Sequence, residues 1–96
     1  MNIYLSLPIS GRTTEEVEKE IEYRKEQLKK ERPESNILSP FDVCKEPIAY
    51  SKCIGLDIMT LLECDAVCMC PGWEASRGCQ LEYEAAKIYH KKLLFL

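Results

Sequence analysis

The fold is decided by the stretch DAVCMCPGWEASRGCQLEYEAAK, residues 65–87. Its first six residues form a short apolar run, which is typical of a β-strand buried on both faces. Pro71 and Gly72 interrupt this run, and a loop of small residues then leads into a predicted helix. Ligands of α/β proteins bind at such strand-to-helix junctions. The stretch therefore predicts a βα unit and a binding site.

The same alternation extends along the rest of the chain. Apolar runs bounded by turn residues predict strands over 3–7, 35–39, 65–70 and 92–96. Helical periodicity predicts helices over 13–31, 51–64 and 76–90, with a loop over 41–49. A βαβαβαβ order predicts one three-layer α/β/α domain over residues 1–96. Its four-stranded parallel sheet would be flavodoxin-like or Rossmann-like in topology.

The bulk composition narrows the partners and the compartment. The 96 residues carry 13 Lys and Arg against 16 Asp and Glu, so no basic excess favours nucleic acid. No apolar run approaches the roughly 18–20 residues that span a membrane. The N-terminus lacks the charged region of a secretory signal, which predicts a cytoplasmic protein. Because so short a chain buries a modest share of its surface, we expect a homodimer or a higher homo-oligomer.

The six cysteines contain no CxxC pair, which is the usual spacing of a metal site. Cys68 and Cys70 alternate on one predicted strand and therefore share a face. We expect no metal, and we interpret the cysteines as small buried side chains in a reducing compartment.

Two acidic residues fall on helix faces that are otherwise apolar. At about 100° per residue, the inner face of helix 51–64 contains Ile54, Ile58, Leu61 and Leu62. Asp57 lies at the edge of that face. The inner face of helix 76–90 would contain Leu81, Ala85, Ile88 and Tyr89. Glu82 lies inside that face, whereas Glu84 points to the opposite side.

A buried carboxylate is costly unless it is paired, hydrogen-bonded or protonated. Asp57 and Glu82 both follow strands of the sheet, so we expect them at the carboxyl edge, where binding crevices form. Such a pair can act as nucleophile and general acid. In the alternative interpretation, both are structural acids bonded to backbone amides or to Arg12 and Arg77.

The start of helix 76–90 also allows two interpretations. Ser76 can cap the helix and Gly78 can permit a tight turn. Alternatively, the first helical amides, the Ser76 hydroxyl and Arg77 form a cradle for an anion such as phosphate. Trp73, in the preceding loop, either covers a nucleobase or caps the core. Tyr4 is either core or a ligand contact, and His90 is interpreted as structural.

Three segments resemble the nucleoside 2-deoxyribosyltransferase-like superfamily. Tyr4-Leu-Ser-Leu-Pro-Ile-Ser-Gly11 resembles its YLAGPI-x-G opening, and Leu56-Asp57 with Leu62-Glu-Cys-Asp65 resembles its D-L…L-x-x-x-D segment. The segment from Ser76 to Ala86 resembles its S/D-x-G-x-x-x-E-x-x-x-A motif. The Pro-Gly-Trp-Glu form is most similar to a small bacterial and phage branch of uncharacterised, DUF4406-like proteins.

The resemblance implies a role for each matching residue. Glu82 would be the nucleophile on C1′ of a deoxyribosyl group, and Asp57 would protonate the leaving base. No cofactor is implied. The residues expected to border the sugar, the base and the phosphate are Tyr4, Ser6, Pro8, Ser10, Gly11, Arg12, Trp73, Ser76, Arg77 and Gly78.

Two positions refine the expected substrate. Ser76 is similar to the serine of the branch that hydrolyses deoxynucleoside 5′-monophosphates, whereas transferases of free nucleosides tend to carry Asp there. Leu7 replaces the glycine of the opening motif, and its side chain is expected to narrow the pocket. We therefore expect a deoxynucleotide hydrolase or a deoxyribosyltransferase, with a non-catalytic nucleotide-binding module as the alternative.

Overall fold

Among the described residues, four short strands pair in parallel in the order β2-β1-β3-β4. The computed structural model describes residues 1–43 and 50–96. The strands are β1 (Asn2–Ser6), β2 (Asn36–Leu38), β3 (Ala66–Met69) and β4 (Lys92–Phe95). The predicted parallel sheet is confirmed, with strand bounds that never extend more than one residue beyond the predicted ranges. Strand β2 lies on one side of β1, and the chain then returns to place β3 on the other side of β1. The direction of strand addition therefore reverses between β1 and β3.

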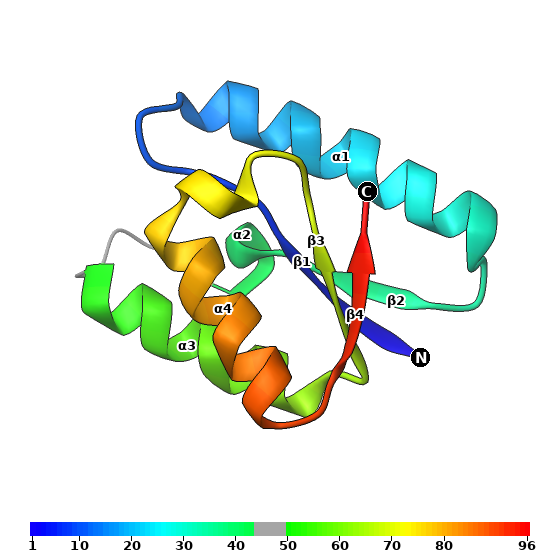
Figure 1. Cartoon of the computed structure of the whole chain (residues 1–96). Helices are drawn as coiled ribbons and strands as arrows, with labels where there is room; N and C mark the ends of the chain where they lie inside the picture. The colour runs from blue at the N-terminus through cyan, green and yellow to red at the C-terminus, as the bar shows by residue number, and fades with distance from the viewer. Residues whose placement is uncertain (44–49) are drawn as a thin grey trace.

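The long helices cover the two faces of this sheet (Figure 1). Helix α1 (Thr14–Glu31) lies on one face, while α3 (Tyr50–Glu63) and α4 (Arg77–Ile88) lie on the other. Helix α1 begins with a capping box between Thr13 and Glu16, which satisfies two amides that the helix start leaves open. The three-layer α/β/α prediction is therefore confirmed.

The predicted loop over 41–49 is wrong in its first part. Residues 40–43 form a helical turn, α2 (Pro40–Val43). The amide and the hydroxyl of Ser39 each donate to Asp42 Oδ2 at 2.9 Å, and proline suits the first position of a helix. The remainder of the predicted loop, residues 44–49, lies outside the described residues.

Strand β1 divides its side chains between the two faces. Ile3, Leu5 and Leu7 contribute to the core under α1, whereas Tyr4 packs into the core under α3 and α4. This division follows from the two-residue period of a strand. One strand thus supplies both hydrophobic cores, and its even-numbered residues face the two helices that carry Asp57 and Glu82.

Three of the four apolar residues predicted on the inner face of α4 are exposed, whereas Ala85 packs against the core and Glu82 is buried as predicted. Leu81, Ile88 and Tyr89 are 49%, 66% and 61% exposed. The side chains that α4 buries are Cys79, Glu82 and Ala86. Two of these three are small, so the helix can lie close above the large Tyr4 and Met69 of the sheet. Helix α4 therefore packs on the sheet with its small side chains, and its most apolar stripe faces away from the sheet.

Helix α4 ends in a Schellman motif that contains His90. The amide of Lys91 donates to the Ala86 carbonyl at 2.8 Å, and that of His90 donates to Lys87 at 3.2 Å. His90 has φ = 57°, the left-handed conformation that this motif requires. The structural interpretation of His90 agrees with this geometry.

Cys44 lies outside the described residues, and the five described cysteines follow the expectation with one exception. Cys64, Cys68, Cys70 and Cys79 are free and buried. Cys53 is disulfide-bonded, so the expectation of a free thiol is wrong at this position. Among the described residues, no group of three or more potential ligands could hold a metal ion. In the same parts of the chain, no helix has the length and apolar character to cross a membrane.

Candidate functional site

A cavity of about 230 Å³ opens at the carboxyl edge of the sheet, next to the point where the strand order reverses. Its described lining residues follow β1 and β2 or lie in α3 and at the start of α4. They are Leu7, Ile9, Ser10, Pro40, Phe41, Cys53, Ile54, Asp57, Ser76, Gly78, Cys79 and Glu82. The structure therefore brings Asp57 and Glu82 into one cavity at the predicted edge.

Glu82 is held by two hydroxyl groups of β1. Ser6 Oγ donates to Glu82 Oε1 at 2.6 Å, and Tyr4 Oη donates to Glu82 Oε2 at 2.8 Å. All three side chains are at least 96% buried, since Glu82 is 4% exposed and the other two are 0% exposed. Both carboxylate oxygens thus have a neutral donor, and the carboxyl group has a fixed orientation.

Burial dominates the protonation of Glu82. Its pKa is raised to about 7, chiefly by desolvation and to a smaller extent by the charge of Asp57, although the hydrogen bonds from Ser6 and Tyr4 oppose the rise. Near neutral pH, Glu82 is therefore divided between its acid and its carboxylate. The alternative predicted an ion pair with Arg12 or Arg77, but among the described ion pairs Arg12 is joined to Glu20 and none includes Glu82 or Arg77.

Asp57 lies on the buried face of α3 and is 6% exposed, so it is not at the edge of that face. Its Oδ1 has no hydrogen-bond partner among the described residues. Desolvation raises its pKa to about 6, while the Tyr4 hydroxyl has the opposite effect. A buried acceptor without a partner is costly, so Asp57 is suited to a ligand that brings a hydrogen-bond donor.

The hydroxyl group of Tyr4 interacts with both acids. Its hydroxyl acts on the pKa of both Glu82 and Asp57. Its own pKa is raised far above its usual value, first by burial and then by the two carboxylates. Tyr4 therefore remains a neutral donor. Tyr4 is a core residue, as one of the two interpretations expects, and its hydroxyl supports Glu82.

A wider groove of about 660 Å³ lies beside the cavity, and its described lining is Pro8, Ser10, Gly72, Ala75, Ser76, Arg77 and Gly78. Ser76 caps α4, since its Oγ accepts a hydrogen bond from the Cys79 amide at 3.3 Å. Ser10, Ser76 and Gly78 line both the groove and the cavity. The predicted cap is confirmed, and the same residues form the wall between the two spaces.

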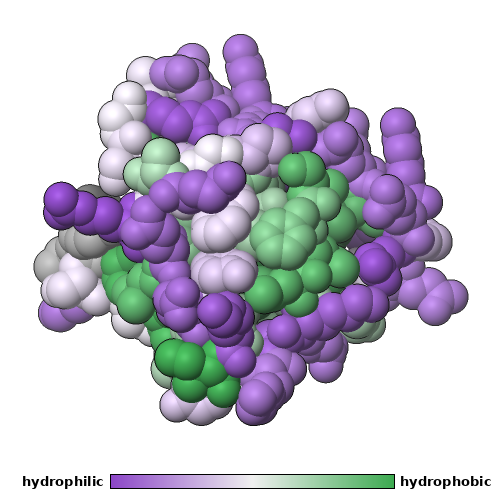
Figure 2. Space-filling model, viewed as in Figure 1, coloured by the Kyte–Doolittle hydropathy of each residue, from purple (hydrophilic) through white to green (hydrophobic). Residues whose placement is uncertain are grey.

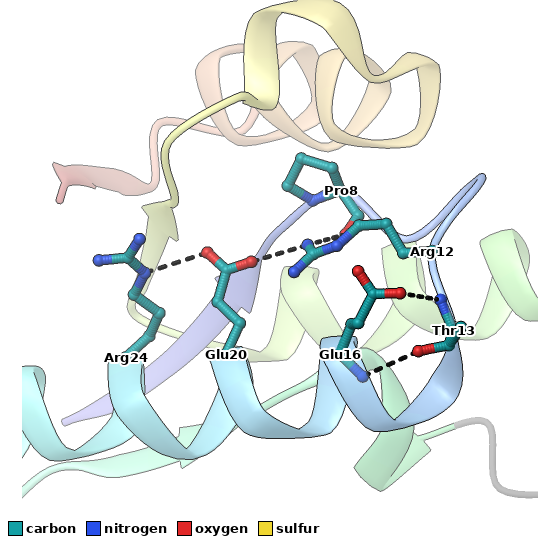
Figure 3. Close-up of polar contacts among 6 residues, drawn as sticks. All are labelled: Pro8, Arg12, Thr13, Glu16, Glu20 and Arg24. Atoms are coloured by element: carbon teal, nitrogen blue, oxygen red, sulfur yellow. Dashed lines mark hydrogen bonds and ion pairs between the residues drawn. The ribbon is translucent and has the colours of Figure 1, made fainter.

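Five predicted contacts are absent from the described lining of both the cavity and the groove: Tyr4, Ser6, Gly11, Arg12 and Trp73. Trp73 belongs to a short 3-10 turn, η1 (Trp73–Ala75), and stacks on Tyr83 with ring centroids 4.7 Å apart. It packs against the core under α4, as the core-capping interpretation expects. Gly11 forms the turn before α1 with φ = 79°. Arg12 points toward Glu20 (Figure 3).

The family model for DUF4406, a domain of unknown function, matches residues 1–95. The chain belongs to this family. No curated protein matches this DUF4406 domain.

Several cavity residues of this DUF4406 domain were missed at the sequence level. Pro40 and Phe41 reach the cavity from α2, and the Ser39-Pro40-Phe-Asp42 pattern is a helix-start signal that predicts this turn. Ile9, Ile54 and Cys79 carry no such signal. They are ordinary apolar residues, and only the tertiary fold places them around the two acids.

The cavity has mainly apolar walls and contains two acids whose pKa values are raised to about 7 and about 6. Glu82 is a fixed carboxyl group with both oxygens supported, and Asp57 has an oxygen free for a ligand. Acids whose pKa values lie close to the working pH are suited to nucleophilic and general acid–base chemistry.

Proposed function

We propose that this DUF4406 domain cleaves the N-glycosidic bond of 2′-deoxynucleoside 5′-monophosphates. The observation that carries the proposal is the pair of buried acids, Glu82 and Asp57, in one cavity at the carboxyl edge of the sheet. The sequence resemblance to the nucleoside 2-deoxyribosyltransferase-like superfamily assigns a nucleophile and an acid to these same two positions.

In the proposed reaction, the ionised Glu82 attacks C1′ of the deoxyribosyl group while the bond from C1′ to the base breaks. Asp57 donates its proton to the departing base. Water then attacks C1′ of the glycosyl ester, with Asp57 accepting a proton, and this step releases deoxyribose 5-phosphate and regenerates Glu82. Because the pKa values are about 7 and about 6, a single proton held by the pair near neutral pH lies mainly on Glu82. The first step requires this proton on Asp57, so the reactive form is the minor one of the two.

The groove at the start of α4 supports a place for the 5′-phosphate. Ser76, Arg77 and Gly78 line it, and the first amides of a helix favour an anion. The two acids disfavour a phosphate inside the cavity by like-charge repulsion. The proposed nucleotide therefore places its base and sugar in the cavity and its phosphate in the groove.

Base release tests the proposal directly. The protein is incubated with each of the four deoxynucleoside 5′-monophosphates and with the free deoxynucleosides, and the free base is quantified by chromatography. We expect release from the monophosphates and none from the Glu82→Ala variant. Release only when a second base is supplied would identify a transferase, and no release from any substrate would contradict the proposal.

A binding module is the second candidate, and Leu7 favours it. Leu7 is 3% exposed and lines the cavity next to the acids, where its side chain limits the room for a substrate. This candidate predicts saturable binding of a deoxynucleotide, measured by calorimetry, without base release.

We also propose that two copies of the chain associate through β4. This strand is an edge of the sheet, and the surface above it is a hydrophobic area bordered by hydrophilic residues (Figure 2). Phe95 is 58% exposed there. A second copy fits because it offers the same unpaired strand edge and the same apolar surface. Sedimentation velocity should show a dimer that Phe95→Lys dissociates and Tyr23→Lys, an exposed change on α1, does not.

A further inference from the structure

Helix α1 and the loop that follows β1 are joined by a network centred on Glu20 (Figure 3). Arg12 Nη1 lies 2.7 Å from Glu20 Oε1, and Arg24 Nε lies 3.1 Å from Glu20 Oε2. The side chains of Arg12 and Glu20 are only 27% and 16% exposed. One carboxylate thus binds two guanidinium groups in a partly buried place, where such pairs are stronger than on an open surface.

Arg12 uses the same nitrogen to hold its own loop. Its Nη1 donates to the Pro8 carbonyl at 2.8 Å, and its backbone amide donates to the Ile9 carbonyl at 3.2 Å. Gly11 supplies the left-handed turn between these contacts, with φ = 79°. The side chain of Arg12 therefore connects the start of the loop to the second turn of α1.

This loop forms one wall of the candidate site. Ile9 and Ser10 line the cavity, while Pro8 and Ser10 line the groove. Pro8 also approaches the opposite loop, since a Cβ at Gly72 would lie 3.4 Å from Pro8 Cγ. Neither Glu20 nor Arg12 is among the described residues that line the cavity or the groove.

We infer that Glu20 is a positioning residue, which holds Arg12 so that the loop from Pro8 to Ser10 keeps the shape of the ligand site. The inference rests on the proposed function and extends it to a residue outside the site. It also assigns Arg12 to the support of the loop, because its guanidinium is engaged by Glu20 and by the Pro8 carbonyl.

A positioning role differs from a merely structural one in what it changes. Glu82 and Asp57 are held by β1 and α3 and not by this loop. Loosening the loop should therefore weaken substrate binding while the chemical step continues at its usual rate. A structural role would lower the amount of folded protein and leave KM unchanged.

The experiment compares Glu20→Gln with the matched control Arg24→Gln in the full chain. Glu20→Gln removes the charge that holds Arg12, whereas Arg24→Gln removes the other half of the network and leaves the Arg12 contact in place. For base release, we expect Glu20→Gln to raise KM roughly tenfold with kcat within about twofold. Arg24→Gln should change KM by less than about twofold.

Hydrogen exchange supplies a readout that does not depend on activity. In Glu20→Gln, the amides of residues 9–13 should exchange faster, while those of β3 should not change. Arg12→Gln is the second variant, and it should reproduce both results if Glu20→Gln does not fold. Faster exchange with an unchanged KM, or an equal rise of KM in Arg24→Gln, would overturn the positioning role.

The failure of the inference and that of the proposed function can be told apart. If the wild-type protein releases base and neither Glu20→Gln nor Arg12→Gln changes KM, only the inference fails. If the wild-type protein binds deoxynucleotide without releasing base, the proposed function fails, and the same comparison is made on Kd by calorimetry. If it does neither, both are wrong.

Discussion

The two faces of the sheet differ in what they bury. The face under α1 buries a continuous apolar core that includes Ile3, Leu5 and Leu28. The face under α3 and α4 buries two carboxylic acids, Asp57 and Glu82, beside its apolar residues. Since burial of apolar area stabilises a fold and burial of a charge opposes it, the first face supports stability and the second carries the candidate chemistry.

Strand β1 is the element that connects these two roles. Its odd residues enter the α1 core, while Tyr4 and Ser6 donate to Glu82 on the other side. A variant that changes one face can therefore be compared with a variant that changes the other.

The largest expected effect is a loss of activity when an acid is changed on the face under α3 and α4, here called the polar face; the face under α1 is called the apolar face. Glu82→Gln keeps the size of the side chain but removes the nucleophile, so we expect base release to fall by at least about 10³-fold. Glu84→Gln, two residues away on the exposed side of α4, should retain nearly full activity. Equal losses in the two variants would contradict the assignment of Glu82.

The apolar face should respond in stability and not in chemistry. Leu28 is 1% exposed in the core under α1, and Leu28→Ala should lower the free energy of unfolding by about 2–5 kcal/mol through lost burial and a cavity. Urea denaturation measures the loss. The turnover of the folded fraction should match that of the wild-type protein, and a specific loss of kcat would show that the two faces are not independent.

The polar face should make stability depend on pH. The pKa of Glu82 is raised to about 7 from its ordinary 4.5, so the unfolded chain releases this proton more readily than the folded one. The stabilising contribution of the protonated form is complete below pH 4.5 and is lost as the pH rises through about 7, by an amount on the order of 3 kcal/mol. Asp57, raised to about 6, adds an effect of the same sign.

Glu82→Gln isolates this effect, because an amide does not ionise. The variant should be more stable than the wild-type protein at pH 8, and the difference between them should shrink toward pH 4.5. Denaturation curves at several pH values measure it. A constant difference across this range would show that the charge of Glu82 is not the cause.

The smallest expected effects come from two matched helix caps. Thr13 caps α1 and Ser76 caps α4, so each change to alanine should cost about 1 kcal/mol of stability. Only Ser76 lines the groove. Ser76→Ala should therefore also weaken the preference for monophosphates over free deoxynucleosides in the base-release assay, and Thr13→Ala should not. A change of preference in both variants would indicate a general effect of helix fraying.

The candidate site was predicted in part from local patterns. Helical periodicity placed Glu82 inside an inner face and Asp57 at the edge of one, and the strand-to-helix order placed both at one edge of the sheet. For α4 the neighbours were wrong, because Leu81 and Ile88 are exposed while Glu82 is buried. The helical period thus predicted the burial of Glu82 correctly, although most of the apolar residues predicted on the same face are exposed.

Arg12 shows a different limit. Its position next to the opening loop suggested a ligand contact, but the structure joins it to Glu20, eight residues later. This pairing depends on how the loop returns to α1, which no spacing in the sequence reveals. Pro40 and Phe41 differ from Arg12 in this respect, because a local helix-start pattern in the sequence indicates the turn that brings them to the cavity.

The sequence by itself determined the order of strands and helices, the caps at Thr13 and Ser76, and the presence of two acids on apolar helices. These features depend on residues within a few positions of one another. Only the tertiary structure decided which face of α4 is buried, and that Tyr4 and Ser6 hold Glu82. It also moved the pKa values of both acids toward neutrality. The physical reason is that desolvation and hydrogen bonding in this cavity come from side chains up to 78 positions apart in the chain, which meet only when the sheet and its helices close around them.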